Sequence, residues 1–115
     1  MKSILTAVIL LALNSLALAD VKPGTREVLL DNATVEVVRL TYPPGTESGM
    51  HTHEHPYRAA YVVKGGKLEL VPADSRQPSQ VLEIADGQAM FLPAATHNVR
   101  NIGPTEVVII ETEIK

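Results

Sequence analysis

Three of the chain's four histidines lie within five residues, at His51, His53 and His55. In an extended strand every second side chain points to the same face, whereas a helix would turn residues two apart onto different faces. We therefore expect these imidazoles to converge. Neutral imidazole is a common ligand for divalent transition metals. The spacing favours a metal site, and a solvated polar loop is the alternative.

Short apolar runs separated by turn residues predict the strands that would position these histidines. We expect strands at 34–42, 59–64, 67–71, 80–84, 88–92 and 106–114. Gly65 and Gly66 predict that 59–64 and 67–71 form a hairpin. No stretch after residue 20 sustains a helical period. The pattern predicts an all-β sandwich or barrel, and a barrel would also remove exposed sheet edges.

The first residues have the pattern of a secretory signal peptide. Lys2 precedes an apolar run from Ile4 to about Leu13, and Ala17 and Ala19 flank Leu18 before Asp20. This arrangement predicts cleavage after Ala19. We expect a signal peptide at 1–19, a single domain at 20–115, and a periplasmic or secreted protein without a membrane anchor. A retained helix that anchors the domain is the alternative.

Composition excludes some classes of partner and of stabilising bond. The chain contains no cysteine, so disulfides cannot stabilise the domain. Its formal net charge is −3 and it has no basic cluster, which argues against nucleic-acid binding. The long apolar closing stretch at 106–114 favours a homodimer formed by strand pairing or by sheet packing.

Two groups of residues resemble the paired motifs of the cupin superfamily. The first group is Gly45, His51, His53 and Gly65, and the second is Gly87, Pro93, His97 and Asn101. The closing stretch from residue 91 also looks like that of small single-domain cupins. The resemblance implies a small jelly-roll-like β-barrel that holds a divalent metal near one open end. It implies His51, His53 and His97 as the metal ligands.

The glutamate that the first cupin motif carries is missing from this chain. Arg58 stands at the glutamate position when His51 and His53 are aligned with the motif histidines. A shifted alignment, in which His53 and His55 form the pair, places Ala59 there and does not restore the carboxylate. The spacing from Gly45 favours His51 and His53, and His55 remains an alternative ligand. Histidine ligation leaves the ion open among zinc, iron, manganese, nickel and copper.

Arg58 cannot bind a metal, but a guanidinium pairs with carboxylates and phosphates. We therefore expect Arg58 to hold an anionic substrate beside the ion, with Tyr61 on the same strand face. The alternative is an Arg58 that points to solvent from a strand end. Glu47 and Glu54 could supply the missing carboxylate, although solvation is the simpler expectation for both.

Three functions are compatible with these residues. One is a metal-dependent enzyme that acts on a small carboxylate-bearing metabolite. Another is a non-catalytic periplasmic module that binds a metal ion or a small anion. The third is a structural or interaction role, in which the barrel is kept and the metal site has been lost. The sequence leaves catalysis undecided because this fold supports many activities.

Overall fold

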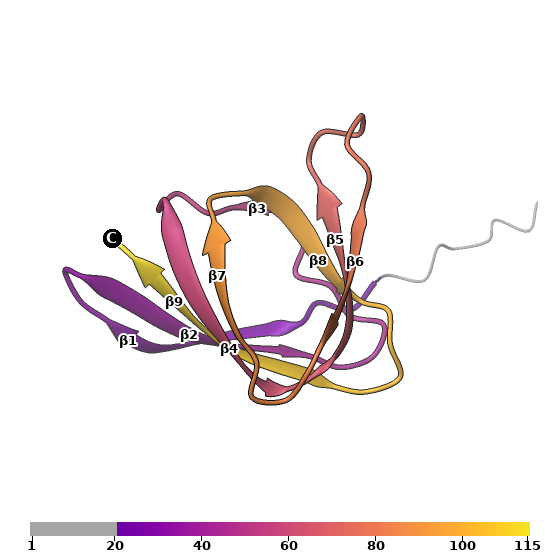
Figure 1. The fold of residues 1–115 in the computed structure, drawn as a ribbon, viewed down its shortest axis with the longest axis horizontal. Coiled ribbons are helices and arrows are strands. Elements are labelled where there is room, and N and C mark those ends of the chain that lie inside the picture. Colours follow the sequence, from indigo (N-terminus) through magenta and orange to yellow (C-terminus); the bar gives the residue numbers. More distant parts are fainter. Residues whose placement is uncertain (1–20) are drawn as a thin grey trace, which may run out of the picture.

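The computed structural model describes residues 21–115 and forms them from strands and connecting turns (Figure 1). The strands of this region are β1 (Thr25–Asp31), β2 (Val35–Tyr42), β3 (His51–Thr52), β4 (Tyr57–Lys64), β5 (Gly66–Pro72), β6 (Gln80–Ile84), β7 (Ala89–Pro93), β8 (Thr96–Asn101) and β9 (Val107–Ile114). The expected signal peptide at 1–19 lies outside the described residues. Within 21–115, no helix is long and apolar enough to cross a membrane.

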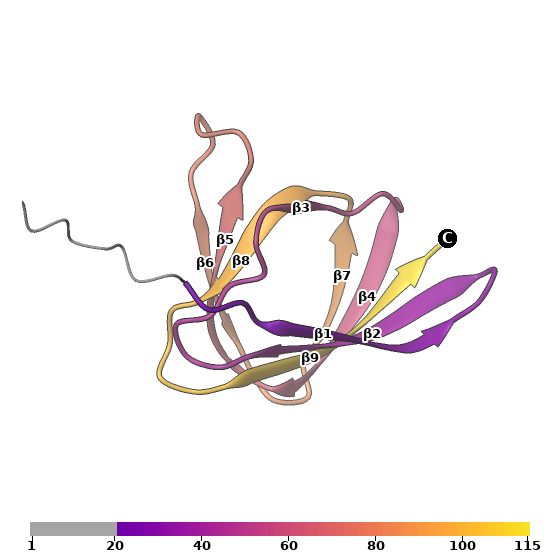
Figure 2. The ribbon, with the colours of Figure 1, turned by 180° about the vertical axis from the view of Figure 1, so that it is seen from behind.

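The strands form two antiparallel sheets that face each other (Figures 1 and 2). One has five strands in the order β1-β2-β9-β4-β7, and the other has four in the order β3-β8-β5-β6. The predicted all-β jelly-roll-like fold is confirmed. Among the strands of residues 21–115, no hydrogen-bonded ladder joins the two sheets, so the barrel stays open and edge strands remain.

The predicted hairpin between 59–64 and 67–71 is wrong. β4 pairs with β7 and β9, whereas β5 pairs with β6 and β8 in the other sheet. The chain crosses between sheets at Gly65, where an added Cβ would lie 2.2 Å from the carbonyl oxygen of Ile84. The glycine therefore permits a close backbone approach at a corner and not a hairpin turn.

The core lies between the sheets, and the alternation of buried and exposed residues is clearest on β4. In β4, Arg58, Ala60 and Val62 are buried while Tyr57 and Tyr61 are exposed. The inner side chains pack against buried residues of the facing sheet, including Leu68 and Val99. The inner face becomes polar toward one end, where β3 and β8 lie.

Asn101 ties the two motif segments together. Its side-chain amide donates to the carbonyl oxygens of Tyr42, at 2.7 Å, and Thr105, at 2.8 Å. Its own backbone carbonyl accepts from the N–H of Gly45 at 3.1 Å. Asn101 is 2 % exposed, so this second-motif residue satisfies buried backbone groups and stabilises the fold. It takes no place among the metal-ligand candidates.

Candidate metal centre

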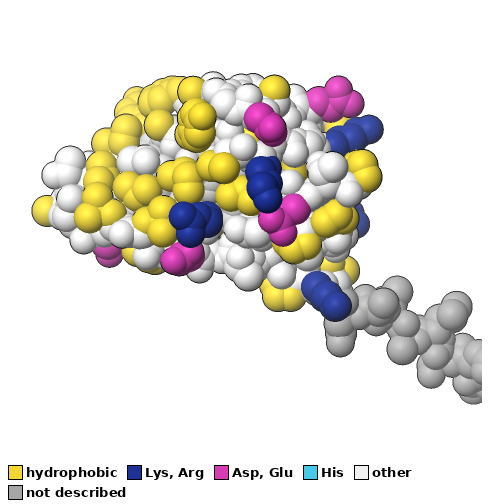
Figure 3. Space-filling model, turned by 90° about the horizontal axis from the view of Figure 1, so that it is seen from below, with side chains coloured by type: hydrophobic (Ala, Val, Ile, Leu, Met, Phe, Trp, Pro, Cys, Tyr) yellow, Lys and Arg dark blue, Asp and Glu magenta, His cyan; other side chains and the backbone are white. Residues whose placement is uncertain are grey.

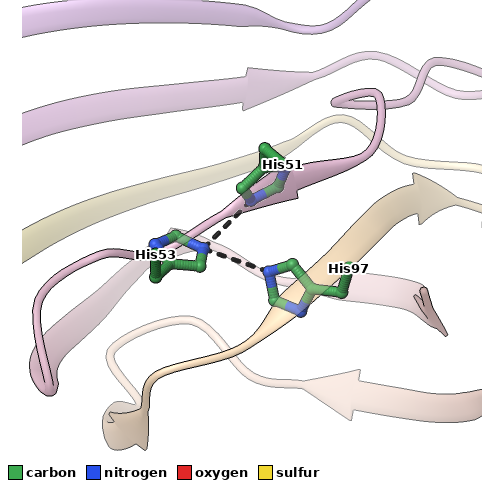
Figure 4. Close-up of side chains that lie close together, drawn as sticks. All are labelled: His51, His53 and His97. Atoms are coloured by element: carbon green, nitrogen blue, oxygen red, sulfur yellow. Dashed lines mark hydrogen bonds between the residues drawn. The ribbon is translucent and has the colours of Figure 1, made fainter. Parts of the chain in front are cut away.

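Three imidazoles converge at the polar end of the space between the sheets. The Nε2 atom of His53 lies 3.0 Å from Nε2 of His51 and 3.1 Å from Nε2 of His97 (Figure 4). His51 lies on β3, His53 follows that strand, and His97 lies on β8 as the cross-strand partner of His51. The structure thus brings together the three histidines that the cupin resemblance implied.

Backbone contacts hold the short β3 segment against β8. The two strands share only the pairs His51 with His97 and Thr52 with Thr96. The N–H of His53 adds a bond of 2.9 Å to the carbonyl oxygen of Ala95. These contacts keep His53 beside the other two rings although it lies beyond the end of β3.

The second nitrogen of His51 is held by the turn that precedes β3. Its Nδ1 lies 2.8 Å from the carbonyl oxygen of Gly49. Gly49 has a φ of 80°, a left-handed conformation that other residues adopt at a cost. A carbonyl oxygen only accepts hydrogen bonds, so Nδ1 carries a proton, and in the neutral ring Nε2 of His51 then presents a lone pair.

The second nitrogen of His53 is held by a carboxylate. Nδ1 of His53 donates to Oε1 of Glu113, and Oε1 of Glu111 lies 3.8 Å away. In the neutral ring this leaves a lone pair on Nε2 of His53, directed at the lone pair of His51. Two such lone pairs 3.0 Å apart repel each other unless a cation lies between them. A carboxylate on the remote nitrogen is also the usual support for a metal-bound histidine.

The spacing of the nitrogens fits one metal ion. At a metal–nitrogen distance of about 2.0–2.1 Å, two ligand nitrogens are separated by roughly 2.9 Å at a right angle and roughly 3.4 Å at the tetrahedral angle. The two Nε2 separations here, 3.0 and 3.1 Å, fall within that range. The ligand atoms of all three histidines lie within 4.8 Å of one another, so a metal ion could contact all three, whereas a bridging proton would satisfy only one pair.

The carboxylates at the site come from β9 and were missed by the sequence analysis. Glu111 and Glu113 share a strand face with the buried residues Val107 and Ile109. Acidic residues in phase with an apolar inner face were the available signal. Glu111, Glu113 and His53 also group closely enough to suit an ion, but Arg58 holds Oε2 of Glu111 at 3.0 Å. We therefore favour the three-histidine group.

Arg58 faces the interior and is not a solvated strand end. It is 5 % exposed, and its Nη1 donates to Oε2 of Glu111. Its Nε is buried without a hydrogen-bond partner in the described structure. Arg58 also opposes Glu113 across the β4–β9 pair. The side chain therefore lies among the site carboxylates and keeps one N–H group available.

Tyr61 does not join Arg58, and the expectation of a shared strand face is wrong. Residues three apart on a strand point to opposite faces, and Tyr61 is 52 % exposed on the outer face. His55 borders the same cavity as the three histidines but lies outside their cluster. Glu54 is exposed at the cavity wall. Glu47 contacts Asn98 and Arg100 instead.

The histidines line a cavity of about 430 Å³, which is large enough for a small metabolite. Its wall includes Arg58, Glu111, Glu113 and Tyr42. A second, mainly apolar cavity of about 400 Å³ is lined by residues of both sheets and shares His97, Arg58 and Glu111 with the first. The ion pair of Arg58 and Glu111 therefore stands between a polar cavity and an apolar one.

Burial sets the protonation of two groups in this wall. Desolvation, with added repulsion from Arg58, His51 and His53, lowers the pKa of His97 to about 4. A neutral imidazole is the form that ligates metal. Desolvation and the negative charge of Glu111 raise the pKa of Tyr42 to about 12. The Tyr42 hydroxyl therefore keeps its proton at neutral pH and can donate a hydrogen bond.

Comparison with known proteins identifies relatives over most of the chain. The sequence pattern of the cupin domain matches residues 38–113. The "Beta-alanine degradation protein BauB" of Pseudomonas aeruginosa is 40 % identical over 89 residues, which cover 76 % of this chain and 90 % of that protein.

Solved structures agree with this relationship. A cupin domain from Bordetella pertussis superposes with a TM-score of 0.74 and 30 % identity, covering 82 % of this chain and 95 % of that one. A conserved protein with a double-stranded β-helix domain from Klebsiella pneumoniae superposes with a TM-score of 0.64 and 22 % identity. The match covers 80 % of this chain and 76 % of that one. The second likeness concerns the fold alone.

The low pKa of His97 predicts an acid-sensitive fold in the metal-free protein. The folded pKa of about 4 lies below the ordinary value of 6.5, so between these values the unfolded chain binds more protons. Stability should fall as pH drops through this window, by at most about 1.4 kcal/mol per pH unit for one proton. Urea unfolding with a chelator should show a weaker pH dependence for His97→Gln. An unchanged dependence in His97→Gln, equal to that of the His55→Gln control, would contradict this assignment.

The contact between Glu113 and His53 predicts a supporting effect on metal affinity. Glu113→Gln removes the negative charge but keeps an oxygen that can accept from Nδ1 of His53. Loss of a partner that supports a ligand typically weakens metal binding about 10–100-fold. Titration of the chelator-treated protein with zinc would measure the loss. Glu106→Gln, at an exposed position, should leave the affinity unchanged, and equal affinities for both variants would refute the supporting role.

Proposed function

This chain belongs to the cupin domain family, and we propose that it binds one divalent transition-metal ion through Nε2 of His51, His53 and His97. The observation that supports the proposal most strongly is the pair of facing lone pairs on His51 and His53. Their Nδ1 protons are engaged by Gly49 and Glu113, so both Nε2 atoms are free to ligate. Imidazole ligands suit zinc, iron, manganese, nickel and copper alike.

We further propose that the ligand of the site is a small carboxylate-bearing metabolite. The two positive charges of a divalent ion and the one of Arg58 exceed the two negative charges of Glu111 and Glu113 by one. A singly charged anion would balance the buried site, and burial makes such a balance energetically important. The free Nε–H of Arg58 provides a donor for that anion.

The relative from Pseudomonas aeruginosa supports this ligand class. It is named for the degradation of β-alanine, a small zwitterion whose single carboxylate suits the N–H donor of Arg58, although its ammonium group leaves it without net charge. The cavity of about 430 Å³ accommodates a molecule of that size. The supporting evidence therefore concerns the class of ligand and leaves the individual metabolite open.

We propose that the site is catalytic, with the side chains of this chain in defined roles. Glu113 keeps His53 in one tautomer and orientation, Arg58 orients the carboxylate, and the protonated Tyr42 hydroxyl can donate to a substrate oxygen. A bound ion would supply Lewis acidity at coordination positions that three histidines leave open. Arg58, Tyr42 and Glu111 are each buried in this wall, and burial strengthens their polar contacts.

One observation favours a non-catalytic metal- or anion-binding module instead. Both carboxylates of the site are already engaged, Glu111 by Arg58 and Glu113 by His53, so neither is free to act as a general base. The two functions share the metal site and differ in turnover. We also propose export to the periplasm or the exterior, which rests on the sequence of residues 1–19.

The metal proposal predicts about one equivalent of bound divalent ion per chain. His53→Ala removes the central ligand and should abolish binding at micromolar metal, whereas His55→Ala should retain it. Elemental analysis after loading and desalting measures both. A folded wild-type protein that retains none of the five candidate metals would contradict the proposal, and a greater loss in His55→Ala than in His51→Ala would assign the site to His53 and His55.

The carboxylate proposal predicts opposite effects from the two members of the buried ion pair. Glu111→Gln frees Arg58 and should tighten the binding of acetate or propionate to the metal-loaded protein. The double variant Arg58→Gln, Glu111→Gln removes the pair without leaving a buried charge. It should bind these anions about ten-fold or more weakly than wild type, because a hydrogen bond to a charged group contributes about 1.5–3 kcal/mol. Calorimetric titration at equal metal loading tests this order, and equal affinities in all three proteins would show that Arg58 does not contact the anion.

A further inference from the structure

The apolar core is closed at its centre and open toward β6 and β7. At the centre, Val38, Val62 and Val107 are fully buried. Five further apolar side chains pack against the core but stay only partly buried, and these are Leu40, Leu70, Leu82, Met90 and Leu92. All five line the cavity of about 400 Å³ beside the candidate metal centre, which we call the apolar cavity. Protein interiors are normally close-packed, so a space of this size within a small core indicates room for a ligand.

Strand register shows that the lining residues of β7 face the interior. Met90 is the cross-strand partner of the buried Ala60, and directly paired residues lie on the same face of a sheet. Leu92 points the same way, whereas Phe91 between them is 65 % exposed on the outer face. Figure 3 views the molecule from below, where β1, β2 and β9 lie in Figure 1, and shows hydrophobic side chains over much of that side. The lining of the apolar cavity is a separate, inward-facing set.

The apolar cavity lies where the two sheets do not join. β7 is an edge strand of one sheet and β6 is an edge strand of the other. Leu82 of β6 is the cross-strand partner of the buried Leu68, so it also faces the interior. Gln77, Gln80 and Thr96 are exposed residues in the wall of the cavity. They mark its rim, so the cavity combines an apolar interior with a polar opening.

The apolar cavity meets the polar cavity of the candidate metal centre at Arg58. Arg58, Glu111 and His97 belong to the walls of both cavities. Arg58 is 5 % exposed, and its Nε is buried without a hydrogen-bond partner in the described structure. A buried N–H without an acceptor is costly, and a guanidinium pairs well with a carboxylate. A carboxylate bound at Arg58 would therefore have the polar cavity on one side and the apolar cavity on the other.

We propose that the apolar cavity binds an aliphatic chain, so that the ligand is a monocarboxylate with an apolar tail of several carbon atoms. The carboxylate end rests on the proposed function, and the tail is the new element. At roughly 30 Å³ for a group the size of a water molecule, a cavity of about 400 Å³ holds on the order of ten such groups. A carboxylate as short as acetate would leave most of this apolar wall without a partner.

Water and polar ligand groups are poorer occupants of this space. A buried water typically makes about three hydrogen bonds, whereas the leucines of the lining and Met90 carry no N–H or O–H group. An ammonium group at the far end of a ligand would lose its hydration among these side chains, which is unfavourable. The lining therefore favours a tail that ends in a methyl group.

Chain length tests the proposal by calorimetric titration of the protein in the presence of zinc. Affinity should rise from acetate through butyrate and hexanoate to octanoate. One buried methylene typically tightens binding about four-fold, so we expect hexanoate to bind at least about 50-fold more tightly than acetate. Heptanoate should bind about ten-fold more tightly than 6-aminohexanoate, which has the same length but ends in ammonium. Equal affinities along the series, or no binding of octanoate at millimolar concentration, would overturn the proposal.

Two neighbouring positions on β6 provide a blocking variant and its matched control. Leu82→Trp fills the apolar cavity and should remove most of the preference for hexanoate over acetate. Val81→Trp places the same ring on the outer face, where Val81 is 52 % exposed, and should keep the preference. The chain has no tryptophan of its own, so emission at a shorter wavelength in Leu82→Trp than in Val81→Trp would confirm that the ring enters the cavity. A full preference that survives with this ring buried would overturn the proposal.

Met90→Gln provides a second, nearly isosteric change in the opposite wall. It introduces an amide among the apolar side chains and should weaken hexanoate binding about five-fold or more, with acetate binding unchanged. Circular dichroism establishes that each variant is folded. Should Leu82→Trp fail to fold, unchanged hexanoate affinity in folded Met90→Gln would by itself overturn the proposal.

This proposal and the proposed function fail in distinguishable ways. Binding of acetate without any gain from longer chains would keep the carboxylate site and remove the aliphatic one. Titration with hexanol, in protein with zinc and in chelator-treated protein, tests the reverse. We expect hexanol to bind about ten-fold or more weakly than hexanoate because it lacks the charge that Arg58 contacts. Equal affinities for the two would assign the tail to the apolar cavity and contradict the carboxylate site.

Discussion

The facing lone pairs of His51 and His53 are the constraint on which the site depends. The Nδ1 atom of each ring donates a hydrogen bond, in His51 to the Gly49 carbonyl oxygen and in His53 to the Glu113 carboxylate. The Nε2 atoms of His51 and His53 then lie 3.0 Å apart, and Nε2 of His97, on the paired strand β8, lies close to that of His53. Such an arrangement is unfavourable without a cation. The left-handed Gly49, the two-residue β3 strand and the acidic end of β9 can all be understood as support for this cluster.

The exchange of a glutamate for Arg58 changes the electrostatics of the site without removing its carboxylates. In cupins with the full motif, the resemblance implies a carboxylate on the strand that here carries Arg58. This chain instead has Glu111 and Glu113 on β9, which pairs directly with that strand. Arg58 donates to Glu111, and Glu113 accepts from Nδ1 of His53. The candidate metal ligands are therefore all neutral imidazoles, and the carboxylates contact His53 and Arg58 instead. The site also contains the cationic Arg58, which favours an anionic ligand.

Much of the fold and part of the site could be predicted from the sequence. Alternating apolar runs and turn residues gave the all-β class, because both patterns are local. The convergence of the histidines followed from their two-residue spacing and from the cupin resemblance. The pairing of strands was harder to predict from the sequence. Gly65 and Gly66 have the composition of a hairpin turn, but the close approach of Gly65 to Ile84 places them at a corner between the two sheets.

The remaining site residues depend on contacts between distant segments. Glu113 reaches His53 only because β9 lies beside β4, and local sequence contains no record of that pairing. Tyr61 was assigned to the wrong strand face, although its offset from Arg58 already determined the opposite one.

The central claim concerns which atoms hold the ion, and anomalous diffraction from crystals of zinc-loaded protein tests it most directly. We predict one anomalous peak per chain within bonding distance of Nε2 of His51, His53 and His97, with Glu113 still accepting from Nδ1 of His53. A peak bound instead by the carboxylates of Glu111 and Glu113 would contradict the account, and so would the absence of any peak near these histidines in a folded, zinc-saturated crystal.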